Sequence, residues 1–188
     1  MICFPPPMWL LADSPDLIAA EFGLTSHPAR TADLPDDLAA AWLALAPDGA
    51  PLHAAHPADD HPGRAIVFID HARRSQFDAL RDALAAGHRL PPVTCAIART
   101  GSGFHGNRSR PWSALAGNLH FSAVIRRPLA ISRAGASLSM LPVTAVAEMI
   151  GQLLPHGRQP EIKWVNDILL DGRKVSGVLT APTDQGST

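Results

Sequence analysis

The sequence has few cysteines and no long apolar run. Only two of its 188 residues are cysteine, Cys3 and Cys95, and they lie far apart, so neither a disulfide framework nor a cysteine metal site is expected. No stretch approaches the roughly 18 apolar residues that a membrane-spanning helix needs. The opening residues lack the basic and apolar regions of a signal peptide. We therefore expect a soluble globular protein of the reducing cytoplasm.

Positive charge is scarce near the N-terminus. Residues 1–60 hold nine of the 17 acidic residues but only one of the 16 lysines and arginines, Arg30. Such a segment cannot neutralise DNA phosphates, so neither a winged helix nor another DNA-binding arm is expected. The basic excess after residue 60 suits an anionic ligand, against which the acidic segment can dock. An equally weighted alternative is that the two regions are solvated independently.

Hydrophobic periodicity predicts an α+β fold, with a mixed or antiparallel β-sheet and helices packed on one side. We expect residues 1–63 to form an acidic, proline-rich segment with short helices, and residues 64–188 to form the main domain. Trp42 is expected in the core. Helices are predicted at 14–23, 35–45, 75–86 and 141–154, a loop at 46–62, and strands at 64–70, 93–98, 119–125, 162–170 and 174–179.

The segment from Lys163 to Leu179 combines charged residues with the pattern of a β-hairpin. Asp171-Gly172 is a dipeptide that tight two-residue turns prefer. Because alternate side chains of a strand share a face, Lys163, Asp167 and Lys174 can converge on one carboxylate or phosphate. Trp164 is then expected on the opposite face, in the core. The alternative is a surface hairpin with ordinary solvated charges.

A glycine-rich loop precedes this hairpin. Gly101, Gly103 and Gly106 are followed by Arg108, Arg110 and Trp112, and then Gly117-Asn118 leads into an alternating strand. Backbone amides and guanidinium groups can surround an anion, and an indole can stack on a flat ring. The alternative for such a loop is a simple turn.

Together these two segments resemble the catalytic domain of biotin protein ligases, with lipoate ligases as the related branch. The resemblance covers about residues 64–179. The family pattern K-W-P-N-D, then R-K-x-x-G-I-L, is matched by Lys163, Trp164, Asn166, Asp167, Arg173, Lys174 and Gly177, with Val165 in place of proline. Gly117-Asn118-Leu119 and Ser122 match the family's G-N-L-x-x-S strand.

The glycine loop departs from the family pattern G-R-G-R-x-G-R-x-W. Gly106, Arg108 and Arg110 are retained before Trp112, but Phe104, His105 and Asn107 stand where a glycine and two arginines are expected. The family's S-T-N after an earlier strand is His71-Ala72-Arg73 here. These departures concern the loop that closes over the substrate more than the hairpin.

The resemblance implies a biotin/lipoate ligase-like fold and an ATP-dependent biotin–carrier-protein ligase, which forms biotinyl-AMP and transfers biotin to a lysine of a biotin carboxyl carrier domain. The alternatives are a lipoate or octanoate ligase or transferase, or a non-catalytic relative that binds biotin or the carrier. The ligands implied are biotin, ATP and Mg²⁺. The implied catalytic residues are Lys174 and Lys163, and Asp167 is the implied magnesium ligand. The implied binding residues are Gly101, His105, Gly106, Asn107, Arg108, Arg110, Trp112, Gly117, Asn118, Asn166, Asp167 and Gly177.

The family's sheet continues beyond this hairpin with a strand of the type G-x-G-x-N. Residues 180–188 are a polar tail without a strand pattern. We therefore expect the C-terminal part of the family fold to be lacking. Either the chain is a shortened relative, or a partner or a second copy completes the open edge.

Overall fold

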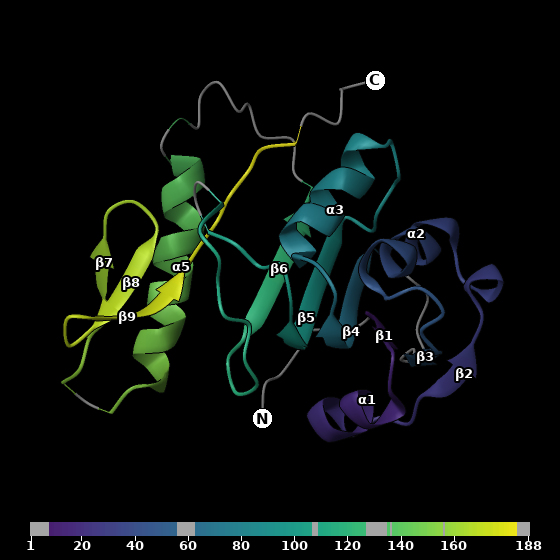
Figure 1. The fold of residues 1–188 in the computed structure, drawn as a ribbon. Coiled ribbons are helices and arrows are strands. Elements are labelled where there is room, and N and C mark those ends of the chain that lie inside the picture. The colour runs from purple at the N-terminus through teal and green to yellow at the C-terminus, as the bar shows by residue number, and fades with distance from the viewer. Residues whose placement is uncertain are drawn as a thin grey trace. The chain divides into compact units, whose positions relative to one another are not determined.

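The computed structural model describes residues 8–55, 63–106, 109–126, 135, 137–155 and 157–183 (Figure 1). These residues form two compact units. The first contains the described residues 8–105 and 111–126, and the second contains residues 106, 109–110 and the described residues after 134. Each unit is described by itself.

The first unit is built on a six-stranded mixed sheet with the order β2-β3-β1-β4-β5-β6. Its elements are β1 (Trp9–Ala12), α1 (Pro15–Phe22), β2 (His27–Ala29), the short 3₁₀-helix η1 (Thr31–Asp33), α2 (Asp36–Leu45), β3 (Leu52–Ala55), β4 (Arg64–Ala72), α3 (Gln76–Ala85), β5 (Val93–Gly101) and β6 (His120–Ile125). Strand β4 runs parallel to both β1 and β5, and the remaining pairs are antiparallel. The expected α+β class with a mixed sheet is confirmed.

Helices cover both faces of this sheet, which corrects the expectation of one. Because side chains alternate along a strand, Val67 on β4 packs in a core with residues of α2 and α3, whereas Ile66 and Phe68 pack with Ile18 of α1 on the other face. Ala65 to Ile69 are all buried. A strand covered on both faces is continuously apolar, as parallel strands usually are.

The predicted helices of the first unit form where local signals are strong. Pro15 occupies the first turn of α1, and Gly23, with φ +65°, ends it by donating its N–H to the carbonyl of Ala19. Helix α2 buries Leu38, Ala41, Trp42 and Leu45, so the core position predicted for Trp42 is confirmed. Helix α3 begins after Ser75, whose hydroxyl accepts from the N–H of Asp78.

Three short strands at the N-terminal side were not predicted. The interval 46–62, expected to be a loop, contains β3. Strands β1 to β3 have only three or four residues each, too few for a clear alternation, and pairing with neighbours determines them. Strand β1 pairs with β4, so the sheet continues across residue 63, where the sequence analysis ended the acidic segment.

The second unit consists of α5 (Ser137–Leu153) and a three-stranded antiparallel sheet with the order β7-β8-β9. These strands are β7 (Glu161–Lys163), β8 (Asp167–Leu170) and β9 (Arg173–Gly177). Val143 and Ala147 of α5 form a small core with Ile168 of β8, and Figure 1 shows the helix alongside these strands.

The predicted strand 162–170 is in fact two strands, because the chain turns at residues 164–166. The predicted turn at Asp171-Gly172 is confirmed, since Leu170 pairs with Arg173 across it. Both turn residues have positive φ, +51° and +74°, as a type I′ turn requires. The segment is therefore a three-stranded meander rather than a single hairpin.

In the part of the chain that the structure describes, no helix is long and apolar enough to cross a bilayer.

Candidate functional site

The meander brings Lys163, Asp167 and Lys174 to one face of its sheet. Lys163 lies directly opposite Asp167 across β7 and β8. Lys174 Nζ lies 2.7 Å from Asp167 Oδ1. The next residue, Ile168, is fully buried against α5, so these three side chains lie on the face away from the helix. The shared face is thus as predicted, although it arises from pairing across the turn at residues 164–166 and not from alternation along one strand. The convergence of these side chains on an anion stays a prediction.

Backbone contacts hold Asn166 and Gly177 beside this face. The carbonyl oxygen of Asn166 accepts from the N–H of Val178 at 2.8 Å, next to the Asp167–Gly177 pair of β8 and β9. Gly177 pairs with Asp167 across β8 and β9. A glycine opposite the carboxylate leaves the backbone uncovered by a side chain, so a ligand can approach closely there. The roles expected for both residues stay predictions.

Trp164 is exposed, which corrects its predicted place in the core. Its exposed fraction is 71 %. The prediction assumed a continuous strand in which Trp164 alternates with Lys163, but residue 164 begins the turn between β7 and β8. A turn residue is not held against the face that α5 covers.

The glycine loop connects β5 to β6, and its two ends run antiparallel to each other. Isolated bridges join Gly101 to Ala114 and His105 to Pro111. The N–H of Trp112 donates to the carbonyl of Phe104 at 2.8 Å. We call residues 101–106 and 110–114 the loop stem. Asn107 and Arg108, two predicted ligand contacts, lie outside the described residues.

Gly101 is required by packing at the base of this stem. A Cβ at position 101 would lie 2.3 Å from Cε2 of Phe104 and 3.0 Å from the carbonyl oxygen of Ala72. Phe104 itself belongs to the core with Ala72. The phenylalanine that departs from the family pattern therefore fills space that the glycine leaves open.

His105 contacts helix α3. Its Nε2 lies 2.5 Å from Oδ2 of Asp78, and the exposed fractions of the two side chains are 30 % and 17 %. Sequence analysis did not find Asp78, because 27 residues separate it from His105 and no spacing rule connects them.

The other predicted contacts near the loop lie towards solvent. Arg110 is exposed, and Trp112 is 37 % exposed. Gly117 has φ +89° in the turn before β6, and the N–H of Asn118 donates to the carbonyl of Leu115. Trp112, Gly117 and Asn118 belong to the first compact unit, whereas Gly106 and Arg110 are grouped with the meander in the second.

A charged cluster lies at the carboxyl ends of β1, β4 and β5, and sequence analysis did not predict it. Both carboxylate oxygens of Asp13 accept from the N–H of Asp70 at 3.0 Å, and the Asp70 carboxylate pairs with Arg99. Burial raises the pKa of the Asp13 carboxyl above its ordinary value, and the nearby Asp70 carboxylate adds to this. The two aspartates are far apart in sequence, and the parallel pairing of β1 with β4 brings them together.

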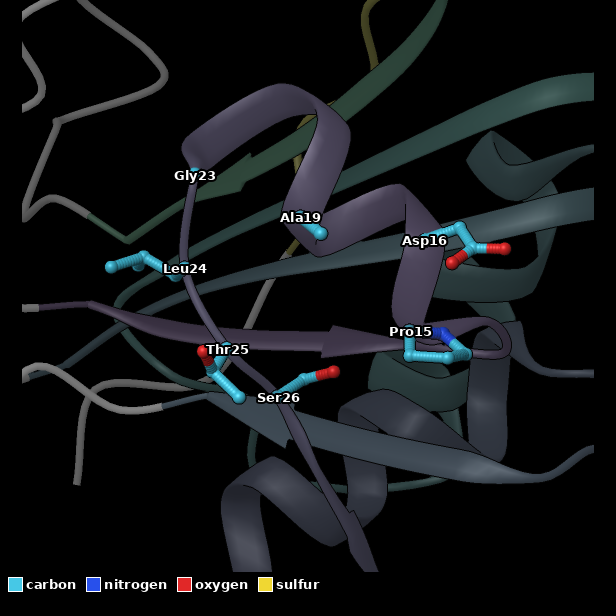
Figure 2. Close-up of a pocket in the computed structure, with 7 residues that line it drawn as sticks. All are labelled: Pro15, Asp16, Ala19, Gly23, Leu24, Thr25 and Ser26. Carbon is cyan, nitrogen blue, oxygen red and sulfur yellow. The ribbon is translucent and has the colours of Figure 1, made fainter.

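Two pockets lie away from the residues predicted from the sequence. One, of about 310 Å³, lies between helix α1 and residues 23–26, which run alongside it (Figure 2). The hydroxyl oxygen of Ser26, a lining residue, is buried without a hydrogen-bond partner within the described structure. The other, of about 650 Å³, lies between the C-terminal half of α5 and residues 157–160. Neither is lined by a predicted site residue.

Within the described ranges, no group of three His, Cys, Asp or Glu side chains is arranged to hold a metal ion. Asp167 offers a single carboxylate, already paired with Lys174. One carboxylate fits Mg²⁺ only if phosphate oxygens of the substrate supply most of the ion's ligands, which is a common arrangement for this ion.

The sequence profile of the Biotin/lipoate A/B protein ligase family matches residues 88–188. This match covers more than half of the chain, and the chain belongs to this family.

Similar curated proteins include the bifunctional ligase/repressor BirA of Bacillus subtilis, which is 34 % identical over 118 residues, covering 63 % of this chain and 35 % of that protein. Another is the biotin–[acetyl-CoA-carboxylase] ligase of Paracoccus denitrificans, 32 % identical over 105 residues, covering 56 % of this chain and 43 % of that protein. The chain thus spans less than half the length of these relatives.

Two solved structures are also similar. Biotin acetyl coenzyme A carboxylase synthetase from Helicobacter pylori, with bound biotinylated ATP, has a TM-score of 0.49 and 22 % identity, covering 63 % of this chain and 55 % of that one. Biotin protein ligase from Leishmania major, in complex with biotinyl-5-AMP, has a TM-score of 0.46 and 21 % identity, covering 63 % and 52 %.

Proposed function

We propose that this chain is an ATP-dependent biotin–carrier-protein ligase. The observation that carries the proposal is the single face of the meander on which Lys163, Asp167 and Lys174 lie together. Family membership restricts the chemistry to the biotin and lipoate ligases, and relatives at 32–34 % identity are named as biotin ligases or BirA proteins. Trp164 and the Arg110-Pro111-Trp112 segment favour the biotin branch.

The reaction has two steps. In the first, a biotin carboxylate oxygen bonds to the α-phosphorus of ATP, the bond to the β-phosphate oxygen breaks, and pyrophosphate leaves. In the second, the amine of a carrier lysine attacks the acyl carbon, AMP leaves, and the amine loses a proton. Negative charge builds on oxygens between the carboxyl group and the α-phosphate in both steps. Preorganised cations that face those oxygens therefore stabilise the transition states.

We assign to Lys174 the role of stabilising this negative charge. Its ammonium group is paired with Asp167 at 2.7 Å, and this contact fixes the direction of a side chain that would otherwise sample many rotamers. Lys163, opposite Asp167, adds a second cation to the same face. Asp167 pairs with Lys174 and lies opposite Lys163 and, where Mg²⁺ binds, would contribute one carboxylate beside the phosphate oxygens of ATP.

We propose ligand contacts for the glycine loop as well, as the family resemblance implies for these residues. Arg110 and Arg108 pair with phosphates, Trp112 stacks on adenine, and the backbone near Gly101, Gly106, Gly117 and Asn118 approaches the ligand. In the meander, Asn166 contacts the nucleotide and Gly177 admits the ligand. The carrier partner is a biotin carboxyl carrier domain that presents its lysine.

Pyrophosphate release tests the proposal. The chain is incubated with ATP and Mg²⁺, together with biotin, lipoate, octanoate or no acid, and pyrophosphate is measured. We expect release that depends on biotin and is at least tenfold slower with the other acids. Transfer of biotin to an added carrier domain, detected by mass, completes the test. Release with lipoate or octanoate alone would move the chain to the other branch, and no release with any acid would contradict a ligase.

A further inference from the structure

His105 and Asp78 form a contact that the proposed mechanism does not use. His105 Nε2 and Asp78 Oδ2 lie 2.5 Å apart, within hydrogen-bonding distance. Asp78 is fixed from its own helix, because Arg81 approaches its second carboxylate oxygen at 3.1 Å and Ser75 accepts from its N–H. The carboxylate lies in the first turn of α3, where the helix dipole favours negative charge.

On its other side, His105 belongs to the loop stem. It is bridged to Pro111, and the next residue, Trp112, donates its N–H to the carbonyl of Phe104. Phe104 is anchored in the core. The stem therefore connects α3 through His105 to the backbone that carries Trp112.

We propose that His105 and Asp78 are a positioning pair that holds Trp112 as a flat surface for the purine base of ATP. This inference rests on the proposed function and assigns His105 a different role from the ligand contact that the family resemblance implies. Neither residue of the pair touches the substrate in this proposal. Trp112 does, with the 37 % of its surface that remains exposed.

The pair affects binding more than chemistry. A stem that is already ordered loses little conformational entropy when ATP binds, whereas a released stem must be ordered at that moment. Trp112 contacts the base in both the ground state and the transition state. Loss of such a uniform contact raises KM with little change in kcat.

The test compares His105→Ala and Asp78→Ala with Asp82→Ala. Asp82 lies on the same helix, pairs with Arg74 near the surface and lies 4.0 Å from Arg81, so its loss removes ion pairs of α3 while Asp78 keeps its contacts with both His105 and Arg81. We expect KM for ATP to rise about tenfold in the first two variants, with kcat within twofold and KM for biotin unchanged. Tenfold corresponds to the lower end of the range for a hydrogen bond to a charged group. Asp82→Ala keeps the parent values.

His105→Gln provides a rescue. Its side-chain amide can donate to Asp78 in place of Nε2, so KM for ATP should return to within about threefold of the parent. The His105→Ala/Asp78→Ala double variant should be no worse than either single variant, because each alone breaks the same contact. A fall in kcat at constant KM, or additive losses, would overturn the proposal.

Two measurements do not depend on turnover. In hydrogen exchange, the amide of Trp112 should exchange at least tenfold faster in His105→Ala than in Asp82→Ala. In fluorescence titration with ATP alone, binding should weaken by the same factor. If the parent binds ATP but releases no pyrophosphate, the ligase proposal fails. The exchange and binding measurements then still test whether His105 and Asp78 position Trp112. Unchanged exchange of the Trp112 amide in His105→Ala, or no binding of ATP by the parent, would contradict the positioning role of the pair.

Discussion

Lys174 acts, at the scale of a single residue, through its charge rather than its bulk. Its side chain is 46 % exposed, so the ion pair with Asp167 is partly screened by water. Such exposed pairs contribute about 0–1 kcal/mol to folding. In an adenylation site, the same ammonium group faces charge that appears only in the transition state.

The substitution Lys174→Met keeps most of the aliphatic stem and removes the ammonium. We expect the free energy of unfolding in urea to change by about 1 kcal/mol or less, and biotin-dependent pyrophosphate release to fall roughly a hundredfold. Arg158→Met is the matched control, because it removes a comparably exposed ion pair with Asp171 in the same unit. Equal activity in the two variants would return Lys174 to an ordinary surface role.

The packing around Gly101 has no room for a side chain. Ala at this position would place its Cβ 2.3 Å from Phe104, well inside any real contact distance. We expect Gly101→Ala to lower the free energy of unfolding by about 1–3 kcal/mol, the usual cost of overpacking.

Two comparisons identify the cause of that loss. Gly101→Ala combined with Phe104→Leu should recover part of it, since the two residues share one space. Gly151→Ala is the control: its Cβ meets nothing nearer than 3.6 Å inside α5, so this helical substitution should stabilise by about 0.5–1 kcal/mol. Denaturation of the three variants and the parent measures all of these values. A neutral Gly101→Ala would show that the base of the loop is loosely packed.

Among the elements, the parallel pairing of β1 and β4 creates an acidic contact that depends on pH. Asp13 is half-buried at the end of β1, and its pKa is raised by burial and by the Asp70 carboxylate. The folded state therefore binds this proton more tightly than the unfolded chain, whose reference value is 3.8. Stability from this group is present below that value and is lost as pH rises through the folded pKa.

The substitution Asp13→Asn should consequently stabilise the fold near neutral pH and have little effect near pH 3. The amide oxygen can still accept from the N–H of Asp70. Urea denaturation across this pH range measures the difference in free energy of unfolding. Asp33→Asn should behave in the opposite direction, because a hydrogen bond from Arg30 lowers the pKa of the Asp33 carboxyl. If both variants show the same trend with pH, the assigned cause for Asp13 is wrong.

In the whole molecule, each compact unit has a core of its own. In the second unit, Ile168 is fully buried against Val143 and Ala147. Removing its outer carbons leaves a cavity that few neighbours can fill, and such changes cost about 2–5 kcal/mol.

We expect Ile168→Ala to accelerate amide exchange in α5 and in strands β7 to β9. Leu38→Ala, which removes a fully buried side chain of α2, should instead accelerate exchange in α2 and the strands beneath it. Peptide-resolved hydrogen exchange by mass spectrometry compares the two variants. Unchanged exchange in the meander of Ile168→Ala would contradict a core centred on that residue.

Strong local patterns determined much of this protein from sequence alone. Helix α1 depends on Pro15 in its first turn and Gly23 at its end, and helix α3 depends on the capping hydroxyl of Ser75. Strand β4 depends on its apolar pattern, and the turn at Asp171-Gly172 depends on positive φ. All of these signals act over a few residues. Alternation also predicted the shared face of Lys163, Asp167 and Lys174, but the structure produces it by pairing Lys163 with Asp167 across the turn at residues 164–166.

Tertiary structure decided what local patterns cannot specify. The short strands β1 to β3 exist because β4 offers them a partner, and α1 covers the second face because β4 is apolar on both sides. The exposure of Trp164 follows from a turn that no glycine or proline marks. The contacts of Asp78 with His105 and of Asp13 with Asp70 join residues 27 and 57 positions apart, and only the folding of the sheet and α3 brings such residues within hydrogen-bonding distance.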